Sequence, residues 1–246
     1  MPQAGLISQY QFLSFDGGAY TNQGRNLKTW WDFEDFLEAT GGNFGQWIST
    51  IVGAGASVAD VAATAIRPGI LSLQTGTTIT GKAAIYAAGY SGTASILFGA
   101  GQYTFETDIY IPVLSTVGEE YIIRIGFGDT TGGDFVDGAY FEYDRLGSGA
   151  NWFKCSASNN TRSKVDTTEP VVAGAWIRLK IVVASGGASI QYFIGGSSYG
   201  IVTTNIPTGA GRETGLIMMM IKSAGTTSRL MNIDWIWLHF DLTASR

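Results

Sequence analysis

Hydrophobic and polar residues alternate with a period of two along most of this chain. The alternation is clear in WISTIV at 47–52 and in AWIRLKIVVAS at 175–185. Alternate side chains of a strand point to opposite faces of a sheet, so the pattern predicts half-buried β-strands. No strand pattern is followed by a long amphipathic helix, so no βαβ unit is expected. The chain is therefore predicted to be all-β.

The remaining apolar runs are short and are separated by Gly-rich or polar turns, which is typical of a β-sandwich or barrel. The runs VADVAATAI at 58–66 and ILSLQT at 70–75 are interpreted as strands. Two hairpins and one meander are also expected. The hairpins are 82–89 with 95–101 and 103–113 with 119–129, and the meander runs through 138–144, 151–158 and 162–168.

The segment at 230–242 raises a question because both of its faces are largely apolar. Strict alternation places Leu230, Asn232, Asp234, Ile236, Leu238 and Phe240 on one face, and Met231, Ile233, Trp235, Trp237 and His239 on the other. A core covers one face only, and a large apolar patch left in water favours aggregation. We expect the second face to be covered by the N-terminal segment or by a neighbouring subunit.

Residues 1–28 are rich in Gln, Gly and aromatic residues and poor in charge. We interpret them as a docking arm, followed by a β-sandwich over 29–246. The stretch QYQFLSF at 9–15 alternates, so it can add a strand to a sheet edge, with aromatic side chains as anchors. The expected interface residues are Tyr10, Phe12, Phe15, Trp235 and Trp237.

Three segments resemble concanavalin A-like lectin/glucanase jelly-roll domains as found in phage virion proteins. They are AGAWIRLKIVVASGGASIQYFIGG at 173–196, RPGILSLQTGTTITGKAAIY at 67–86 and LMNIDWIWLHF at 230–240. The resemblance implies a two-sheet antiparallel jelly-roll sandwich whose closing strand pairs near the N-terminal strand. It also implies carbohydrate binding, glycoside cleavage, or virion attachment or decoration.

Composition and charge argue against several classes of partner and location. The net charge is −5 and Lys and Arg do not cluster, so a nucleic-acid partner is not expected. The longest apolar run, Leu216–Ile221, is far shorter than the ~20 residues of a membrane span. The N-terminus lacks the pattern of a signal peptide. Cys155 is the only cysteine, and we expect it to be a small buried side chain without a disulfide.

The sequence FETDIYI offers paired carboxylates, Glu106 and Asp108, on one strand face. Paired carboxylates can cleave glycosidic bonds. Laminarinase-type glucanases of this fold carry Glu-x-Asp-x-x-Glu, but the third acid is replaced here by Ile111. We therefore assign no catalytic residue and expect a non-enzymatic protein, with the two acids on a polar face opposite buried Phe105 and Ile109.

Two other groups are candidates for ligand binding. Asp129, Asp134 and Asp137 lie in a Gly-rich loop and would suit calcium, which prefers several oxygen ligands. The alternative is a solvated loop. Aromatic side chains can stack on sugars, and the alternative for them is core packing. The candidate carbohydrate-binding residues are Trp152, Trp176, Tyr140 and Tyr143.

The preferred function is a non-enzymatic phage virion protein, either a capsid decoration (cement) protein or a tail-fibre component. It would be made in the host cytoplasm and would assemble as a homo-oligomer with other virion proteins. The first alternative is a lectin-like module that binds a cell-surface glycan. The second is a glycan hydrolase or lyase.

Overall fold

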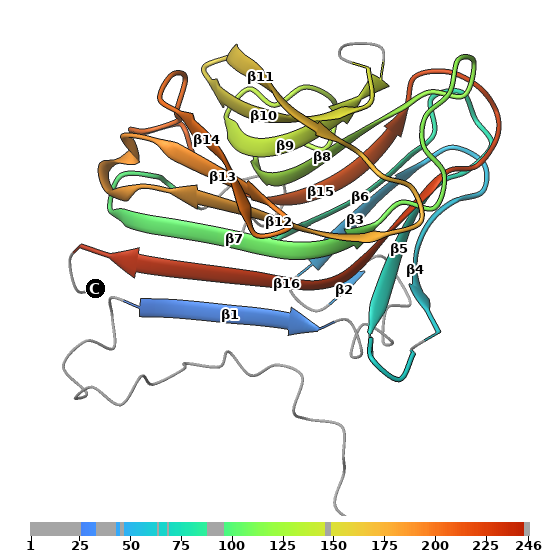
Figure 1. Cartoon of the computed structure of the whole chain (residues 1–246), viewed down its shortest axis with the longest axis horizontal. Coiled ribbons are helices and arrows are strands. Elements are labelled where there is room, and N and C mark those ends of the chain that lie inside the picture. The colour runs from blue at the N-terminus through green and yellow to red at the C-terminus, as the bar shows by residue number, and fades with distance from the viewer. Residues whose placement is uncertain are drawn as a thin grey trace, which may run out of the picture.

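The computed structural model describes residues 26–32, 43–44, 47–62, 64–67, 69–87, 96–145 and 149–243. These residues form two antiparallel sheets that stack face to face as a sandwich (Figure 1). Sheet A has the order β14-β13-β12-β7-β16-β5-β4, and β1 also pairs with β16. Sheet B has the order β11-β10-β9-β8-β15-β6-β3-β2. The all-β jelly-roll prediction is confirmed.

Most strands agree with the segments predicted from the sequence. The predicted strand at 58–66 ends at Val61, and in the predicted strand at 95–101 only Ile96 and Phe98 form isolated bridges before Gly101. The strands divide between the two sheets. In sheet A they are β1 (Asn26–Asp32), β4 (Ala56–Val61), β5 (Ile70–Thr75), β7 (Gly101–Tyr110), β12 (Trp176–Val183), β13 (Ile190–Ile194), β14 (Ser197–Val202) and β16 (Leu230–Leu242). In sheet B they are β2 (Asn43–Phe44), β3 (Trp47–Val52), β6 (Lys82–Ala87), β8 (Tyr121–Gly128), β9 (Gly138–Asp144), β10 (Asn151–Ser158), β11 (Thr161–Pro170) and β15 (Gly215–Lys222).

Strand pairing was predicted only in part. The meander β9-β10-β11 is confirmed, and the segment 173–196 forms the hairpin β12-β13. The hairpin of 82–89 with 95–101 is wrong, because β6 lies between β3 and β15, while Ile96 bridges to Thr214. The pairing of 103–113 with 119–129 is also wrong. The chain crosses from sheet A to sheet B between β7 and β8, so these strands meet across the core, with the rings of Phe105 and Phe127 6.0 Å apart.

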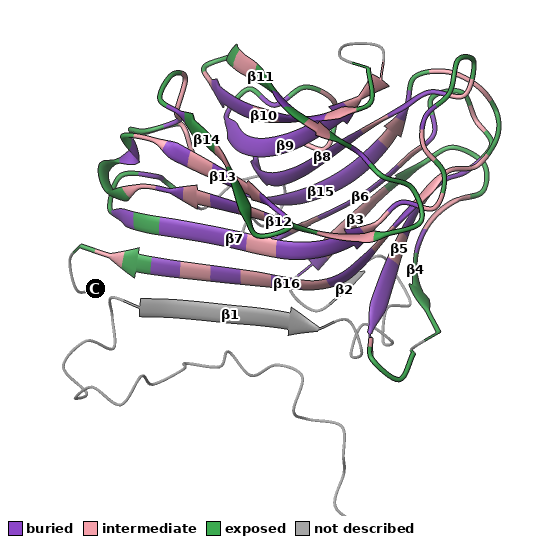
Figure 2. Cartoon of the chain, viewed as in Figure 1, coloured by how far each residue is buried: buried purple, intermediate pink, exposed green. Residues whose placement is uncertain are grey.

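The core lies between the inner faces of the two sheets. Figure 2 shows nearly continuous burial along β8, β9 and β15 of sheet B. On β12 the inner face carries Leu179, Ile181 and Val183, all fully buried, with Ile177 packed at the margin. Arg178 and Lys180 point to the opposite face, as the alternation of this segment indicates.

A β-bulge in β16 resolves the question of its two apolar faces. The register against β7 shifts between Ile233 and Ile236, so β16 holds one residue more than its partner there. The phase of alternation therefore reverses at Asp234 and Trp235. The prediction of strict alternation is wrong, because Met231, Ile233, Ile236, Leu238 and Phe240 all reach the core.

β1 runs along the same edge of β16 as β5 and pairs with residues Trp235–Asp241, Trp30 being opposite Trp237. The pairing of the closing strand with an N-terminal strand agrees with the resemblance. The predicted boundary between residues 28 and 29 falls within β1. The arm residues Tyr10, Phe12 and Phe15 lie outside the described residues. In the part of the chain that the structure describes, no helix is long and apolar enough to span a membrane.

Candidate functional site

The outer face of sheet A carries a row of six alternating charges, which we call the charge row. Its members come from β16, from the turn before β5, from β7 and from β12. In spatial order they are Asp234, Arg67, Asp108, Arg178, Glu106 and Lys180. Opposite charges thus meet at every step along the row.

The strand register explains four of the six members of the charge row. Arg178 is the cross-strand partner of Asp108, and Lys180 is the partner of Glu106. Opposite charges facing each other across antiparallel strands are favourable. Arg178 Nε lies 3.2 Å from Asp108 Oδ1 and 3.6 Å from Glu106 Oε1, and Lys180 Nζ lies 3.6 Å from Glu106 Oε2.

The bulge in β16 explains the rest of the row. It places Asp234, which is buried, beside Arg67 of the turn that precedes β5. Thr107 Oγ1 donates a hydrogen bond of 2.7 Å to the carbonyl oxygen of Trp235 and so holds the bulge. Arg67 Nη1 pairs with Asp234 and lies 3.6 Å from Asp108 Oδ2. The bulge therefore connects the edge turn with the centre of the sheet.

Aromatic rings lie beside all three cations of the row. The guanidinium of Arg67 is 3.9 Å from the ring centroid of Trp176, and that of Arg178 is 5.2 Å from the ring of Trp235. Lys180 Nζ is 5.6 Å from the ring of Phe193. Such cation–π contacts hold both partners in a defined orientation.

Exposure differs between the acids and the cations of the charge row. The side chain of Asp108 is 11% exposed and that of Arg178 is 52% exposed. Trp176, Trp235 and Trp237 are partly exposed, and the ring of Trp237 stacks on His239 at 5.7 Å. A molecule approaching this face would therefore meet aromatic rings and the N–H groups of the cations, with carboxylate oxygens recessed between them.

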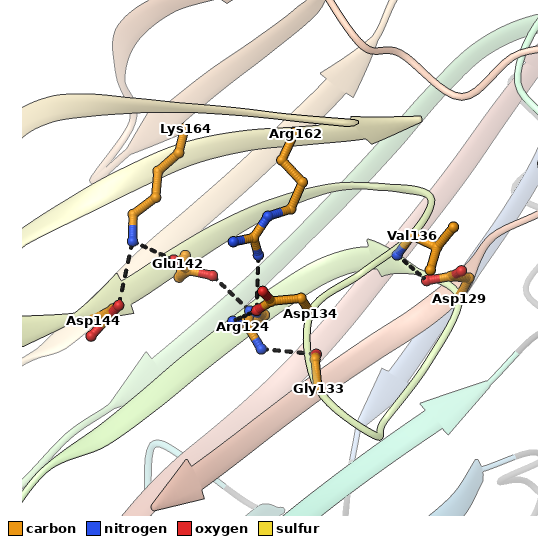
Figure 3. Close-up of polar contacts among 9 residues, drawn as sticks. All are labelled: Arg124, Asp129, Gly133, Asp134, Val136, Glu142, Asp144, Arg162 and Lys164. Atoms are coloured by element: carbon orange, nitrogen blue, oxygen red, sulfur yellow. Dashed lines mark hydrogen bonds and ion pairs between the residues drawn. The ribbon is translucent and has the colours of Figure 1, made fainter. Parts of the chain in front are cut away.

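A second polar cluster, the sheet B network, lies on the outer face of sheet B (Figure 3). Glu142 of β9 is almost fully buried between two cations. Arg124 Nε donates to Glu142 Oε2 at 2.6 Å, and Lys164 Nζ lies 2.6 Å from Glu142 Oε1. Arg124 also pairs with Asp134, which lies 2.9 Å from Arg162 Nη1.

Burial and neighbouring charges shift the pKa values of Lys164 and Cys155 on the same face. Burial alone would lower the pKa of Lys164, but the hydrogen bond and the negative charge of Glu142 outweigh it, so the net shift is upward. Burial raises the pKa of the Cys155 thiol, and the charge of Glu142 adds to the shift. Cys155 is buried and free, as predicted, and its thiol is held in the unreactive protonated form.

Comparison with known proteins identifies the family. Residues 66–234, well over half of the chain, match the family described as SO2946-like, C-terminal domain. The chain belongs to this family.

Solved structures show how far the fold of this SO2946-like chain is shared. SO2946 itself, a protein of unknown function from Shewanella oneidensis MR-1, is 12% identical with a TM-score of 0.64, over 90% of this chain and 89% of that one. The carbohydrate recognition domain of Emp46p in its potassium-bound form is 10% identical with a TM-score of 0.54, over 85% and 95%. At these identities the likeness shows the fold alone. No curated protein matches the chain in sequence.

The predicted calcium ligands of this SO2946-like chain have separate protein partners. Asp129 Oδ1 accepts from Val136 N at 3.1 Å, and Asp134 pairs with two arginines. Asp137 accepts from Asn159 N and pairs with Arg212. Within the described part of the chain, no three His, Cys, Asp or Glu side chains are grouped to hold a metal ion.

The predicted sugar-binding aromatics do not form one surface. Trp152 and Tyr143 are buried in the core between the sheets, where their rings cannot reach a ligand. Tyr140 lies on the other side of sheet B but is buried against Phe135. That grouping is therefore corrected, and only Trp176 is partly exposed, on the outer face of sheet A.

From the sequence, two members of the charge row, Glu106 and Asp108, were identified and the others were missed. Glu106 and Asp108 share an outer face, opposite the buried residues Phe105 and Ile109, as expected. The alternation of β12 places Arg178 on a polar face, so it could have been proposed as a partner of these acids. Arg67 gave no signal, because it lies far from these residues in the sequence and reaches them only through the turn before β5.

Proposed function

We propose that this protein binds a neutral glycan, without cleaving it, on the outer face of sheet A. The observation that carries the proposal is the charge row with partly exposed tryptophan rings beside it. A sugar ring has an apolar face that stacks on an aromatic ring and hydroxyl groups that need donors and acceptors. One solved structure of this fold is the carbohydrate recognition domain of Emp46p, which supports the proposal.

The charge balance supports a neutral ligand. The row contains three acids and three cations, paired with one another, so it presents donors and acceptors without a net charge. Because ion pairs and cation–π contacts already order these side chains, binding would lose less side-chain entropy. The glycan would therefore be selected by the geometry of its hydroxyl groups.

A glycan array followed by isothermal titration calorimetry tests the proposal. Trp235→Ala should weaken binding of the neutral glycan about 10–100-fold, because an aromatic contact contributes about 1.5–3 kcal/mol. Ile201→Ala, an exposed side chain on β14 of the same sheet, should leave Kd unchanged. Failure of the wild-type protein to bind any neutral glycan, or an equal loss in both variants, would contradict the proposal.

The same preparation also separates binding from catalysis. Glu106 and Asp108 are both held in ion pairs with Arg178, which favours a structural role for these carboxylates. If the wild-type protein released reducing ends from the bound glycan and Glu106→Gln abolished the release, hydrolysis would replace binding as the function.

The virion role is a separate proposal that rests on the resemblance of the segment at 67–86 to phage virion and tail proteins. A capsid decoration or tail-fibre protein should form an oligomer of fixed size, which light scattering would detect as a mass independent of concentration. A monomer at all concentrations would count against this role.

A further inference from the structure

The loop between β8 and β9, residues Asp129–Asp137, lies across the outer face of sheet B. Phe135 is fully buried and packs its ring edge-on against Tyr140, with 4.5 Å between the centroids. The loop also reaches the far strands of the sheet, because Lys82 of β6 donates a 2.7 Å hydrogen bond to the carbonyl oxygen of Thr131. The loop therefore acts as a cover for this face.

The surface under the cover is apolar. The cluster around Phe135 consists of Ala84, Tyr140, Phe153, Cys155, Ala157, Ile217 and Met219, all of them buried. Glycines at the two ends of the loop allow the ring of Phe135 to lie close to the backbone of the sheet. A Cβ added to Gly128 would lie 2.5 Å from the ring of Phe135, and one added to Gly138 would lie 3.0 Å from it.

The cover is anchored to the cations of the sheet B network by the carboxylate of Asp134, beside a hydrogen bond from Arg124 Nη1 to the carbonyl oxygen of Gly133. Asp134 Oδ1 pairs with Arg124 Nη2 and lies 2.9 Å from Arg162 Nη1 (Figure 3). The carboxylate side chain is 55% exposed, whereas the Arg124 side chain is only 5% exposed. The anchor is thus a solvent-accessible carboxylate on a buried guanidinium, and another carboxylate from solution can compete for the same position.

We propose that Arg124 and Arg162 form a binding site for a uronic acid residue of an acidic glycan, and that Asp134 and Phe135 occupy this site when the loop is closed. Guanidinium groups match carboxylates in shape and charge. The loop presents a six-membered ring to Tyr140 and, from the neighbouring residue, a carboxylate to the two arginines. A hexuronate presents the same pair of features in one molecule.

The charge of the site favours such a ligand once the loop has moved. Without Asp134, the sheet B network contains three cations, Arg124, Arg162 and Lys164, against two carboxylates, Glu142 and Asp144. The site then has an excess of one positive charge. This proposal is independent of the neutral glycan on sheet A, which lies on the other side of the sandwich.

The test compares the wild-type protein with Asp134→Ala, using oligogalacturonate as the probe and calorimetry as the readout. Removal of the internal competitor should tighten binding of oligogalacturonate at least about tenfold, since one charge-assisted hydrogen bond is worth about that factor. Arg162→Gln in the Asp134→Ala background should abolish the gain. Backbone amides of residues 131–136 should exchange hydrogen faster in Asp134→Ala.

Matched control variants show whether the gain in affinity arises at this site. Asp241→Asn removes an exposed carboxylate from sheet A and should not change the affinity for oligogalacturonate. Trp235→Ala should also leave it unchanged, so failure of the neutral-glycan proposal would be seen separately. The proposal is wrong if Asp134→Ala gains no affinity, if a neutral galactose oligomer gains as much, or if inorganic phosphate gains as much as oligogalacturonate.

Discussion

Arg124→Met should lower the free energy of unfolding by about 3–5 kcal/mol, as expected when one partner of a buried ion pair is removed. Arg124 donates to Glu142 at 2.6 Å, and the side chains of both residues are almost fully buried. Met has a side chain of similar shape near the backbone but lacks the N–H donors of the guanidinium group. Among the described residues, Lys164 alone would then remain in an ion pair with Glu142, and the loop would lose the hydrogen bond from Arg124 to Gly133 O.

Two further variants isolate the cost of the uncompensated charge. Arg124→Met combined with Glu142→Leu should be more stable than Arg124→Met alone, because apolar residues of similar volume can replace a buried pair at little cost. Arg178→Met removes an arginine that also has two acidic partners, but its side chain is 52% exposed, so the loss should stay within about 1 kcal/mol. Urea unfolding measures all three. Equal losses in Arg124→Met and Arg178→Met would show that burial does not control the energy of the Arg124–Glu142 pair.

The fold class and most strands follow from the sequence because a half-buried strand needs a period of two, and this period is visible without knowledge of the partners. The match is close for β5, β12 and β16. The pairing of the strands, in contrast, does not follow from the sequence of each strand. β7 and β8 are neighbours in sequence, yet their inner faces pack across the core. β7 pairs with the distant strands β12 and β16, and β8 pairs with β9 and with the distant strand β15. Whether two successive strands form a hairpin or face each other across the core depends on the order of all strands in both sheets, so no single segment determines it.

The candidate site depends on the same distant contacts. A bulge inserts one residue into β16 and so exchanges its faces, and no pattern in LMNIDWIWLHFDL marks the position of the inserted residue. The charge row then requires Arg67, which lies 167 positions from Asp234 in the chain. Aromatic residues were visible as candidates, but the sequence alone could not separate Trp152, which is in the core, from Trp176, which is not.

Ile181→Ala should cost about 2–5 kcal/mol in the free energy of unfolding, because it removes buried methyl groups and leaves a cavity in a core that relaxes only partly. Ile181 is fully buried at the centre of β12, where its cross-strand partners are Phe105 and Tyr192. Its Cδ1 atom also reaches sheet B, where it would lie 2.6 Å from a Cβ placed on Gly126. The side chain thus fills space between both sheets, and neither sheet can move in without disturbing its own pairing.

The neighbouring residue Lys180 provides the matched control for Ile181→Ala. Lys180 lies on the outer face of the same strand, with a side chain that is 34% exposed and an ion pair of 3.6 Å to Glu106. Lys180→Ala should therefore cost at most about 0.5 kcal/mol. Urea unfolding curves with equal slopes would report the two values on one scale. If the two variants lost the same stability, Ile181 would not be a core residue, and the phase of β12, on which both the core and the charge row depend, would be wrong.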